Sequence, residues 1–227
     1  KIFHYNDALL LSDLIPVLEN LGLKVVDELP FRIRLSDDNC CYIYDFSLLY
    51  DDSPNMDPTV KREIFNDAFI NVWYGKAEND LFNRLALKAD LTWREVAAFR
   101  GYAKYMKQLG FSFSPQFIAE TLLKHGEAVD ILAWMFAYRF NPKHVNAPEE
   151  TVKGLKPRLD EILDKIQNLS EDKIIRKYYE LIHATMRTNF YQLDADGQAK
   201  EYISFKFSPV CLTSFTHFLN HRSFICC

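Results

Sequence analysis

The sequence of 227 residues contains only seven glycines, and no two of them lie close enough to build a turn that cradles phosphate. Dinucleotide folds and Walker loops need such glycines because the backbone must approach the phosphates closely at the start of a helix. We therefore expect this chain by itself to bind neither a dinucleotide nor ATP by those routes.

The sequence also lacks long apolar runs and a basic face. Its longest apolar runs, such as residues 131–136, fall far short of the roughly twenty residues that a membrane span needs. The formal net charge is −4, and the charged residues of both signs are interspersed along the chain. We expect no membrane and no nucleic acid among the partners.

Cysteine is scarce, and its count is odd. The five cysteines are Cys40, Cys41, Cys211, Cys226 and Cys227. Two adjacent pairs are unlike the even, spaced pattern of a secreted disulfide scaffold, so we predict a reducing, cytoplasmic location. The chain opens at Lys1 without an initiator Met or a signal-peptide pattern, and we expect it to come from a longer protein.

Apolar side chains are plentiful, since 48% of the residues are hydrophobic and 15% are aromatic. This composition predicts a buried core and one or two globular domains. The apolar spacing changes from a period of two to a helical period at Pro58, after the polar segment 51–57 that contains Pro54. We therefore expect an α+β unit first and a mainly helical domain after it.

The first fifty residues predict a strand, a helix and a hairpin. Residues 2–5 form the strand, and the helix ends at Gly22. Two starts are compatible with the sequence. Asn6 or Asp7 can cap the helix, or Ser12 can cap it. If Ser12 is the cap, Pro16 lies in the first turns of the helix, where its missing N–H costs least. Two alternating runs, 24–35 and 41–49, form the hairpin around the turn 37–39.

Helical spacing dominates the remainder of the chain. We expect helices at residues 59–74, 79–89, 92–108, 115–124, 127–140, 148–168 and 170–188, then a strand at 202–207. We interpret the large aromatic residues as core packing: Trp73, Trp93, Tyr102, Tyr105, Trp134 and Phe136. Trp93, Phe99, Tyr102 and Met106 should share one buried helix face.

Two segments carry metal-ligating residue types, and in both we favour the ordinary interpretation. The turn from Asp194 to Gly197 begins like a calcium loop but lacks the later ligands, so we expect a simple turn. The tail holds Cys211, His217, His221, Cys226 and Cys227 without a Cys-x-x-Cys pair, so we predict no metal. No nucleophile and base have distinctive spacing, and we predict no catalytic residue in this chain.

Four blocks resemble the large bacterial NAD-specific glutamate dehydrogenases, in the same order. The first is residues 11–31, Leu-Ser-Asp-Leu-Ile-Pro-Val-Leu-Glu-Asn-Leu-Gly and onward, which is similar to an ACT-like domain of that family. The others are Ala-Glu-Asn-Asp-Leu-Phe-Asn-Arg-Leu at 77–85 with Leu-Thr-Trp-Arg-Glu at 91–95, Phe-x-x-Arg-Phe-x-Pro at 136–142, and Leu-Ile-His-Ala-Thr-Met-Arg-Thr-Asn-Phe-Tyr-Gln at 181–192. The resemblance is expected to end after Ser208-Pro209.

The resemblance implies a domain order. Residues 1–57 are a small ACT-like α/β sandwich unit, which could extend to about residue 75, and residues 58–192 are a helical domain. Residues 193–227 are a turn, a strand and an atypical tail at the entry to the dehydrogenase domain. A truncation or a shifted reading frame would explain that tail.

The resemblance also implies a function. The family oxidatively deaminates L-glutamate to 2-oxoglutarate with NAD, and this chain would be a non-catalytic regulatory or structural segment that holds no cofactor itself. Its partners would be the remainder of the dehydrogenase chain, further copies in a homo-oligomer, and an amino-acid effector. The alternatives are a free-standing amino-acid-sensing ACT-like module and a helical protein–protein interaction domain.

The three functions predict different surfaces. A dehydrogenase segment should leave large apolar patches exposed, a sensor should have a closed polar pocket beside the sheet, and an interaction domain should have an apolar groove between helices. The effector residues would be Asn6, Asp7, Ser12 and Asp13, where the N–H groups of a helix start favour a carboxylate. Ordinary caps are the alternative for these four.

Overall fold

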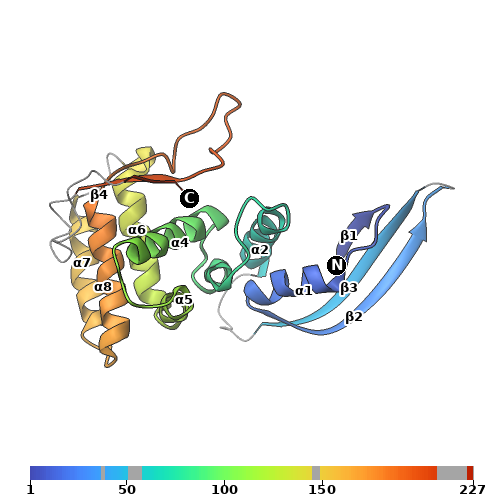
Figure 1. The fold of residues 1–227 in the computed structure, drawn as a ribbon, viewed down its shortest axis with the longest axis horizontal. Helices are drawn as coiled ribbons and strands as arrows, with labels where there is room; N and C mark the ends of the chain where they lie inside the picture. The colour runs from blue at the N-terminus through green and yellow to red at the C-terminus, as the bar shows by residue number, and fades with distance from the viewer. Residues whose placement is uncertain (37–38, 51–57, 145–148, 209–223, 227) are drawn as a thin grey trace. The chain divides into compact units, whose positions relative to one another are not determined.

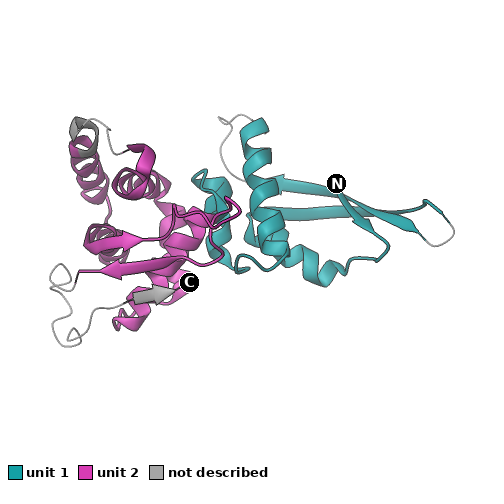
Figure 2. Cartoon of the chain, turned by 90° about the horizontal axis from the view of Figure 1, so that it is seen from above, with its two compact units in different colours: residues 1–93 teal, residues 94–227 magenta. Residues whose placement is uncertain are grey.

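The computed structural model describes residues 1–36, 39–50, 58–144, 149–208 and 224–226. The chain divides into two compact units, residues 1–93 and 94–227, which Figure 1 shows in one ribbon and Figure 2 in two colours. The expected boundary at 51–57 lies outside the described residues, and the domain bounds drawn from the sequence stay predictions.

The first unit combines one small sheet with helices, as an α+β fold requires. Its elements are β1 (Ile2–Tyr5), α1 (Leu11–Asn20), β2 (Leu23–Arg34), β3 (Cys40–Tyr50), α2 (Pro58–Trp73), a 3-10 turn η1 (Leu81–Arg84) and α3 (Leu85–Lys88). All described strand pairs are antiparallel, in the order β1-β3-β2. The hairpin expected from the alternating runs is confirmed as β2 and β3, with a bulge between Val25 and Asp27.

The helix α1 does not begin at any of the residues that were predicted to cap it. It starts at Leu11, and the cap position is Leu10, whose side chain makes no capping hydrogen bond. Ser12 is therefore inside the helix, and the expectation that Ser12, Asn6 or Asp7 caps it is wrong. Burial of Leu14, Val17 and Leu18 against the core sets the start of this helix instead.

Gly22 ends α1, as its position predicted. Its φ of +94° lies in the left-handed region that glycine adopts without strain. Its N–H donates to the Glu19 carbonyl over 2.9 Å. A Cβ added there would lie 2.9 Å from Arg84 Cγ, so the position is restricted by contact as well as by backbone geometry.

The second unit is mainly helical. It contains α4 (Trp93–Gln108, of which only Trp93 falls in the first unit), α5 (Pro115–Lys124), α6 (Gly126–Phe140), η2 (Pro142–His144), α7 (Glu149–Leu163) and α8 (Leu169–Ala184). An antiparallel sheet follows, with β4 (Thr185–Thr188), β5 (Ser204–Phe207) and β6 (Phe224–Cys226) in that spatial order. The start of α5 matches its predicted signal, because the Ser114 hydroxyl accepts from the Phe117 N–H over 3.1 Å.

Three expected helices differ from the structure. Residues 79–89 form η1 and the single turn of α3, and the helix expected to reach residue 168 ends at Leu163. The helix expected at 170–188 ends at Ala184, because Thr185 adopts an extended ψ of 120° and residues 185–188 pair with β5 as β4. That pairing joins segments distant in the sequence, so helical periodicity does not reveal it.

Aromatic side chains form the core of the second unit. Tyr102 lies at its centre, with ring centroids of Phe205, Phe207 and Phe136 at 4.7, 6.1 and 6.3 Å. The predicted buried face of α4 is confirmed for Phe99, Tyr102 and Met106.

The prediction that Trp134 belongs to the core is wrong. Trp134 is 51% exposed and contacts Tyr138 and His144 on the surface instead. Trp73 and Trp93 are half-buried, whereas Tyr105 and Phe136 are buried as expected.

Within the described residues, no helix combines the length and the apolar character needed to cross a membrane.

Candidate functional site

One face of the sheet in the first unit is apolar and exposed. The register places Phe3, Ile43 and Phe31 in one cross-strand row and Tyr5, Cys41 and Ile33 in the next. Side chains directly opposite, and those two residues along a strand, point to the same side of a sheet. We call the surface formed by these six residues and Leu29 the outer sheet face.

The side chains on this face remain accessible. Phe3 is 64% exposed, Phe31 49% and Ile33 47%, whereas Tyr44 on the opposite face is 5% exposed. The Tyr44 hydroxyl accepts from the Leu9 N–H over 2.6 Å, so the inner face is tied to the segment that leads into α1. The outer sheet face therefore gathers large apolar side chains without a covering layer in the described residues.

The edge of this face is polar. Lys1 Nζ donates to Asp45 Oδ2 over 2.5 Å, and Asp45 lies opposite Leu29 in the same row of the sheet. A contiguous apolar patch with a charged border is typical of a surface that contacts another protein segment. The geometry suits docking, and it provides no paired acid and base for chemistry.

The four predicted effector residues are exposed and already make contacts within the chain. Asn6 adopts a φ of 67°, donates its N–H to the Cys40 carbonyl over 2.8 Å and accepts from the Cys40 N–H over 3.2 Å. Asp7 contributes its carbonyl to a 2.7 Å contact with His4 Nδ1. The Ser12 hydroxyl donates to Asp13 Oδ1 over 3.4 Å.

The structure thus gives these residues two different local roles. Asn6 connects the end of β1 to the start of β3, whereas Ser12 and Asp13 form a pair in the first turn of α1. An amino-acid site at these residues stays a prediction.

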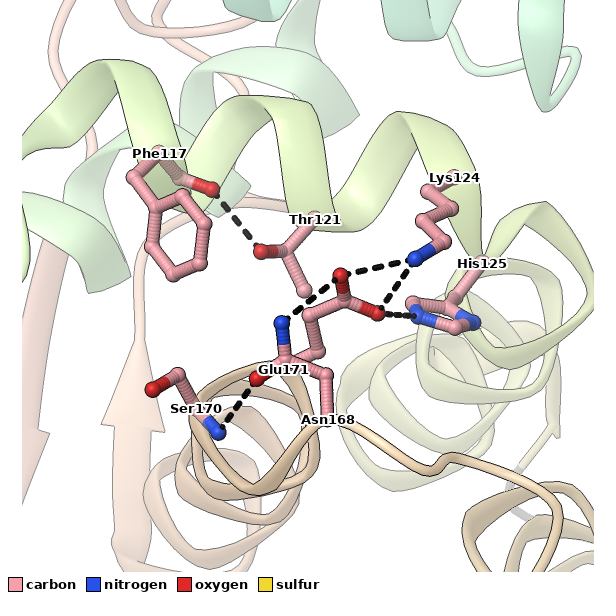
Figure 3. A network of polar contacts seen from close by, with 7 residues as sticks. All are labelled: Phe117, Thr121, Lys124, His125, Asn168, Ser170 and Glu171. Atoms are coloured by element: carbon pink, nitrogen blue, oxygen red, sulfur yellow. Dashed lines mark hydrogen bonds and ion pairs between the residues drawn. The ribbon is translucent and has the colours of Figure 1, made fainter.

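A buried carboxylate organises a polar network in the second unit, drawn in Figure 3. Lys124 Nζ donates to both oxygens of Glu171, over 2.8 and 3.0 Å, and His125 Nε2 lies 2.7 Å from Oε2. Asn168 donates to Oε1 over 3.3 Å, and its own Oδ1 accepts from the Ser170 N–H over 2.9 Å. The network joins the end of α5 to the first turn of α8.

The electrostatics of this network favour the ionised carboxylate. The hydrogen bond from Lys124 holds the pKa of Glu171 below its ordinary value, and the hydrogen bond from His125 adds to the effect. Burial opposes the shift but does not cancel it. Because the carboxylate is fully occupied by partners within the chain, we assign it a structural role.

Only half of this network has a signal in the sequence, and the network is not among the predictions made from it. Asn168 and Glu171 have the spacing of a capping box, in which the acidic residue turns back to the start of its own helix. Here Glu171 reaches Lys124 and His125 instead, and these lie more than forty residues away in the chain. Local spacing cannot show which basic residues the fold brings to the carboxylate.

No metal site is found among the described residues, where groups of three or more His, Cys, Asp or Glu side chains with suitable geometry are absent. The tail residues Cys211, His217 and His221 lie outside the described residues.

At the predicted turn, Asp194 Oδ1 accepts from the N–H groups of Asp196 and Gln198 over 3.0 and 2.8 Å. The simple turn is therefore confirmed.

Three protein-family models match consecutive parts of the chain. Residues 1–60 match a glutamate dehydrogenase ACT3 domain, and residues 77–142 match a glutamate dehydrogenase helical motif 3. Residues 158–221 match the catalytic domain of bacterial NAD-glutamate dehydrogenase. This last match continues past Pro209 to residue 221, so the expectation that the resemblance ends after Pro209 is wrong.

Curated relatives agree with these matches. The chain is 43% identical over 212 residues to an NAD-specific glutamate dehydrogenase of Pseudomonas aeruginosa and 41% identical over 209 residues to one of Halomonas elongata. Each alignment covers 92% of this chain, and the chain spans 13% of the length of either relative. A Mycobacterium tuberculosis protein of the same name is 32% identical over 80% of the chain.

Proposed function

This chain belongs to the bacterial NAD-specific glutamate dehydrogenase family, and on that basis we propose that it is a non-catalytic structural and regulatory segment of a larger dehydrogenase. In this proposal the parent enzyme converts L-glutamate to 2-oxoglutarate with NAD. The parent works in the cytoplasm as a homo-oligomer.

The outer sheet face is the observation that carries the proposal. A free-standing soluble domain rarely exposes several large apolar side chains in adjacent rows, because burying them is favourable at about 25 cal/mol per Å². Phe3, Phe31 and Ile33 lie together in this way. This is the pattern expected of a segment that packs against more protein. It favours a segment of a larger dehydrogenase over a free-standing amino-acid sensor.

The occupant that we propose for this face is another segment of the same long polypeptide. The chain spans 13% of the length of its bacterial relatives, so a family member has ample protein to cover the face. A segment of the same chain is also held at a high effective concentration, so it would bind a modest patch readily.

The NAD of the parent enzyme does not fit the described residues. A dinucleotide fold needs parallel strands joined by a helix, with a glycine-rich turn at the helix start. All the strand pairs described here are antiparallel, and the glycines of the chain are isolated. We therefore place cofactor binding elsewhere in the parent chain and derive no chemical step from these residues.

The second unit supports a scaffolding role for the helical motif. Tyr102 lies in the segment that matches the helical motif, whereas Tyr178, Phe205 and Phe207 lie in the segment that matches the catalytic domain. Tyr102 contacts all three rings in one buried cluster. In our proposal, the helical motif supports the first part of the catalytic domain by sharing its core.

A substitution on the outer sheet face tests the proposal. Phe31→Asp in this chain should leave the unfolding midpoint nearly unchanged, because the side chain is half exposed. An aspartate at the aligned position of the full-length Pseudomonas aeruginosa relative should reduce glutamate-dependent NAD reduction at least tenfold and lower the stability of each subunit, since it would bury an unpaired charge.

Tyr74→Asp is the matched control, because Tyr74 is 73% exposed, lies in the first unit and is not part of the outer sheet face. Its counterpart in the full-length enzyme should retain activity. If the Phe31 counterpart keeps full activity and normal assembly, the face is not covered in the enzyme and the proposal fails. If the Phe31 counterpart leaves each subunit stable and only prevents two full-length copies from associating, the occupant is a neighbouring subunit and our assignment is wrong.

A further inference from the structure

The strand β3 is longer than the strand that pairs with one of its two edges. β2 pairs with β3 along its whole length, from Cys40 to Tyr50. β1 pairs with the other edge of β3 at residues 41–44. Among the described residues, no strand pairs with residues 46–50 on that edge, and β3 continues past the start of β1 in Figure 1. We call residues 46–50 the open edge of β3.

The open edge of β3 differs in composition from the outer edge of β2. Backbone N–H and C=O groups on an unpaired strand edge can bind a further strand, and proteins protect such edges with proline or charged side chains. β2 is the last strand of its sheet and contains Pro30 between the charged residues Glu28 and Arg32. The open edge of β3 has the sequence Phe-Ser-Leu-Leu-Tyr, with neither proline nor a charged residue. We therefore expect the edge of β3, and not that of β2, to bind another strand.

The side chains along the open edge indicate what kind of strand fits there. Successive side chains of a strand point to opposite faces of the sheet, so Phe46 and Leu48 lie on the same face as Tyr44. Leu49 lies on the other face, which is the side of the outer sheet face, and is 56% exposed. Apolar side chains that lie opposite one another on neighbouring strands stabilise a sheet. A strand at this edge should therefore carry apolar side chains on both of its faces.

We propose that the open edge of β3 binds an extended strand of the parent dehydrogenase polypeptide, antiparallel to β3 and in line with β1. The inference rests on the proposed function, because the strand belongs to the parent chain. The established pairing of β1 with β3 supports this occupant, since a strand in line with β1 continues the same antiparallel ladder. The relatives also have ample protein to supply it, because the chain spans 13% of their length. Main-chain hydrogen bonds provide the affinity, and the leucines at the edge provide the specificity.

Photo-cross-linking in the full-length Pseudomonas aeruginosa relative tests this site. Benzoylphenylalanine replaces the residue aligned with Leu49 in one variant and the residue aligned with Ser47 in another, because both side chains lie on one face of the sheet. Each probe should cross-link to a segment of the same polypeptide outside the 212 aligned residues. Moving the probe from Leu49 to Ser47 should move the cross-linked residue about two positions toward the C-terminus of that segment, because antiparallel strands rise equally per residue.

Hydrogen exchange shows whether the edge is open in the 227-residue chain. Residues 41–44 lie between two strands, so their N–H groups should be protected. About half of the N–H groups of residues 46–50 should exchange rapidly, because alternate groups point away from β2. In the full-length relative, the N–H groups at the positions aligned with residues 46–50 should all be protected.

A third probe separates this inference from the proposed function. Benzoylphenylalanine at the position aligned with Phe31 reports on the outer sheet face. If that probe cross-links to another segment of the polypeptide while the Leu49 and Ser47 probes do not, the inference is wrong and the proposed function stands. If none of the three probes cross-links to another segment, both are wrong.

Three further results would overturn the inference. A shift of about four or five positions between the Leu49 and Ser47 probes would indicate a helix at the edge, since a helix rises only about 1.5 Å per residue. Cross-links to a second polypeptide would assign the edge to a neighbouring subunit. Protection of every N–H group of residues 46–50 in the 227-residue chain would show that the edge is already covered.

Discussion

At the scale of single residues, Tyr102 is a fully buried member of the aromatic core of the second unit. It is 1% exposed, its ring contacts four other aromatic rings, and its hydroxyl lies 3.0 Å from Thr185 Oγ1. Burial raises the pKa of Tyr102, which favours the neutral phenol. One side chain thus provides both apolar packing and a satisfied buried hydroxyl.

Shortening this residue should be costly. Tyr102→Ala should lower the free energy of unfolding by about 3–5 kcal/mol, since it leaves a large cavity, whereas Tyr102→Phe should cost about 1 kcal/mol for the hydrogen bond. Urea unfolding followed by circular dichroism measures both. The exposed Trp134→Ala is the control and should cost clearly less than Tyr102→Ala, and a loss of under about 1 kcal/mol for Tyr102→Ala would contradict the buried position.

The predicted amino-acid site can also be tested at one residue. An effector held by Ser12 and Asp13 should give saturable heat in calorimetry with one of the common amino acids, and Asp13→Ala should weaken that binding. Asp13 is exposed and accepts only a long hydrogen bond from Ser12, so its removal should leave the fold intact. If no amino acid gives heat at millimolar concentration, this part of α1 acts as scaffold only.

At the scale of helices, the contact between α5 and α8 depends on a charge. Glu171 accepts hydrogen bonds from Lys124 and lies against His125, and both come from the end of α5 or the residue after it. The carboxylate also lies in the first turn of α8, where the helix dipole favours a negative charge. The helices are therefore held together most strongly when Glu171 is ionised.

This charge predicts a dependence of stability on pH. The pKa of Glu171 is lowered in the folded chain, so its contribution is fully present above the ordinary glutamate pKa of about 4.3 and disappears as the pH falls through the lowered value. Glu171→Gln should therefore unfold more easily than the unchanged chain near pH 7, and the two should converge in acid. Glu161→Gln, at an exposed position, is the control. A difference that stays constant from pH 7 to pH 3 would show that charge is not the cause.

At the scale of the whole chain, the described residues form two units, and no nucleotide fold occurs among them. The purified 227-residue protein should show no glutamate-dependent reduction of NAD, because the described strands are antiparallel and the glycines stand apart. Absorbance of NADH at saturating glutamate measures this against a preparation from cells that lack the gene. Turnover above that control would show that a catalytic site exists in these residues.

Much of the fold follows from local signals in the sequence. The hairpin of β2 and β3 follows from alternating side chains, the start of α5 from Ser114, and the end of α1 from Gly22. Each of these depends on a few neighbouring residues, whose backbone preferences act in any surroundings. The family resemblance likewise lay in short runs of sequence that could be compared directly.

The tertiary structure decided the features that depend on distant residues. Residues 185–188, for which the spacing predicts a helix, are a strand because they pair with β5. Trp134 lies on the surface. The fold also brought Lys124 and His125 to Glu171. The sequence by itself determined the hairpin of β2 and β3, the start of α5 and the end of α1, because local backbone preferences are short-ranged. Only the fold determined what their side chains meet, because those contacts join residues far apart in the chain.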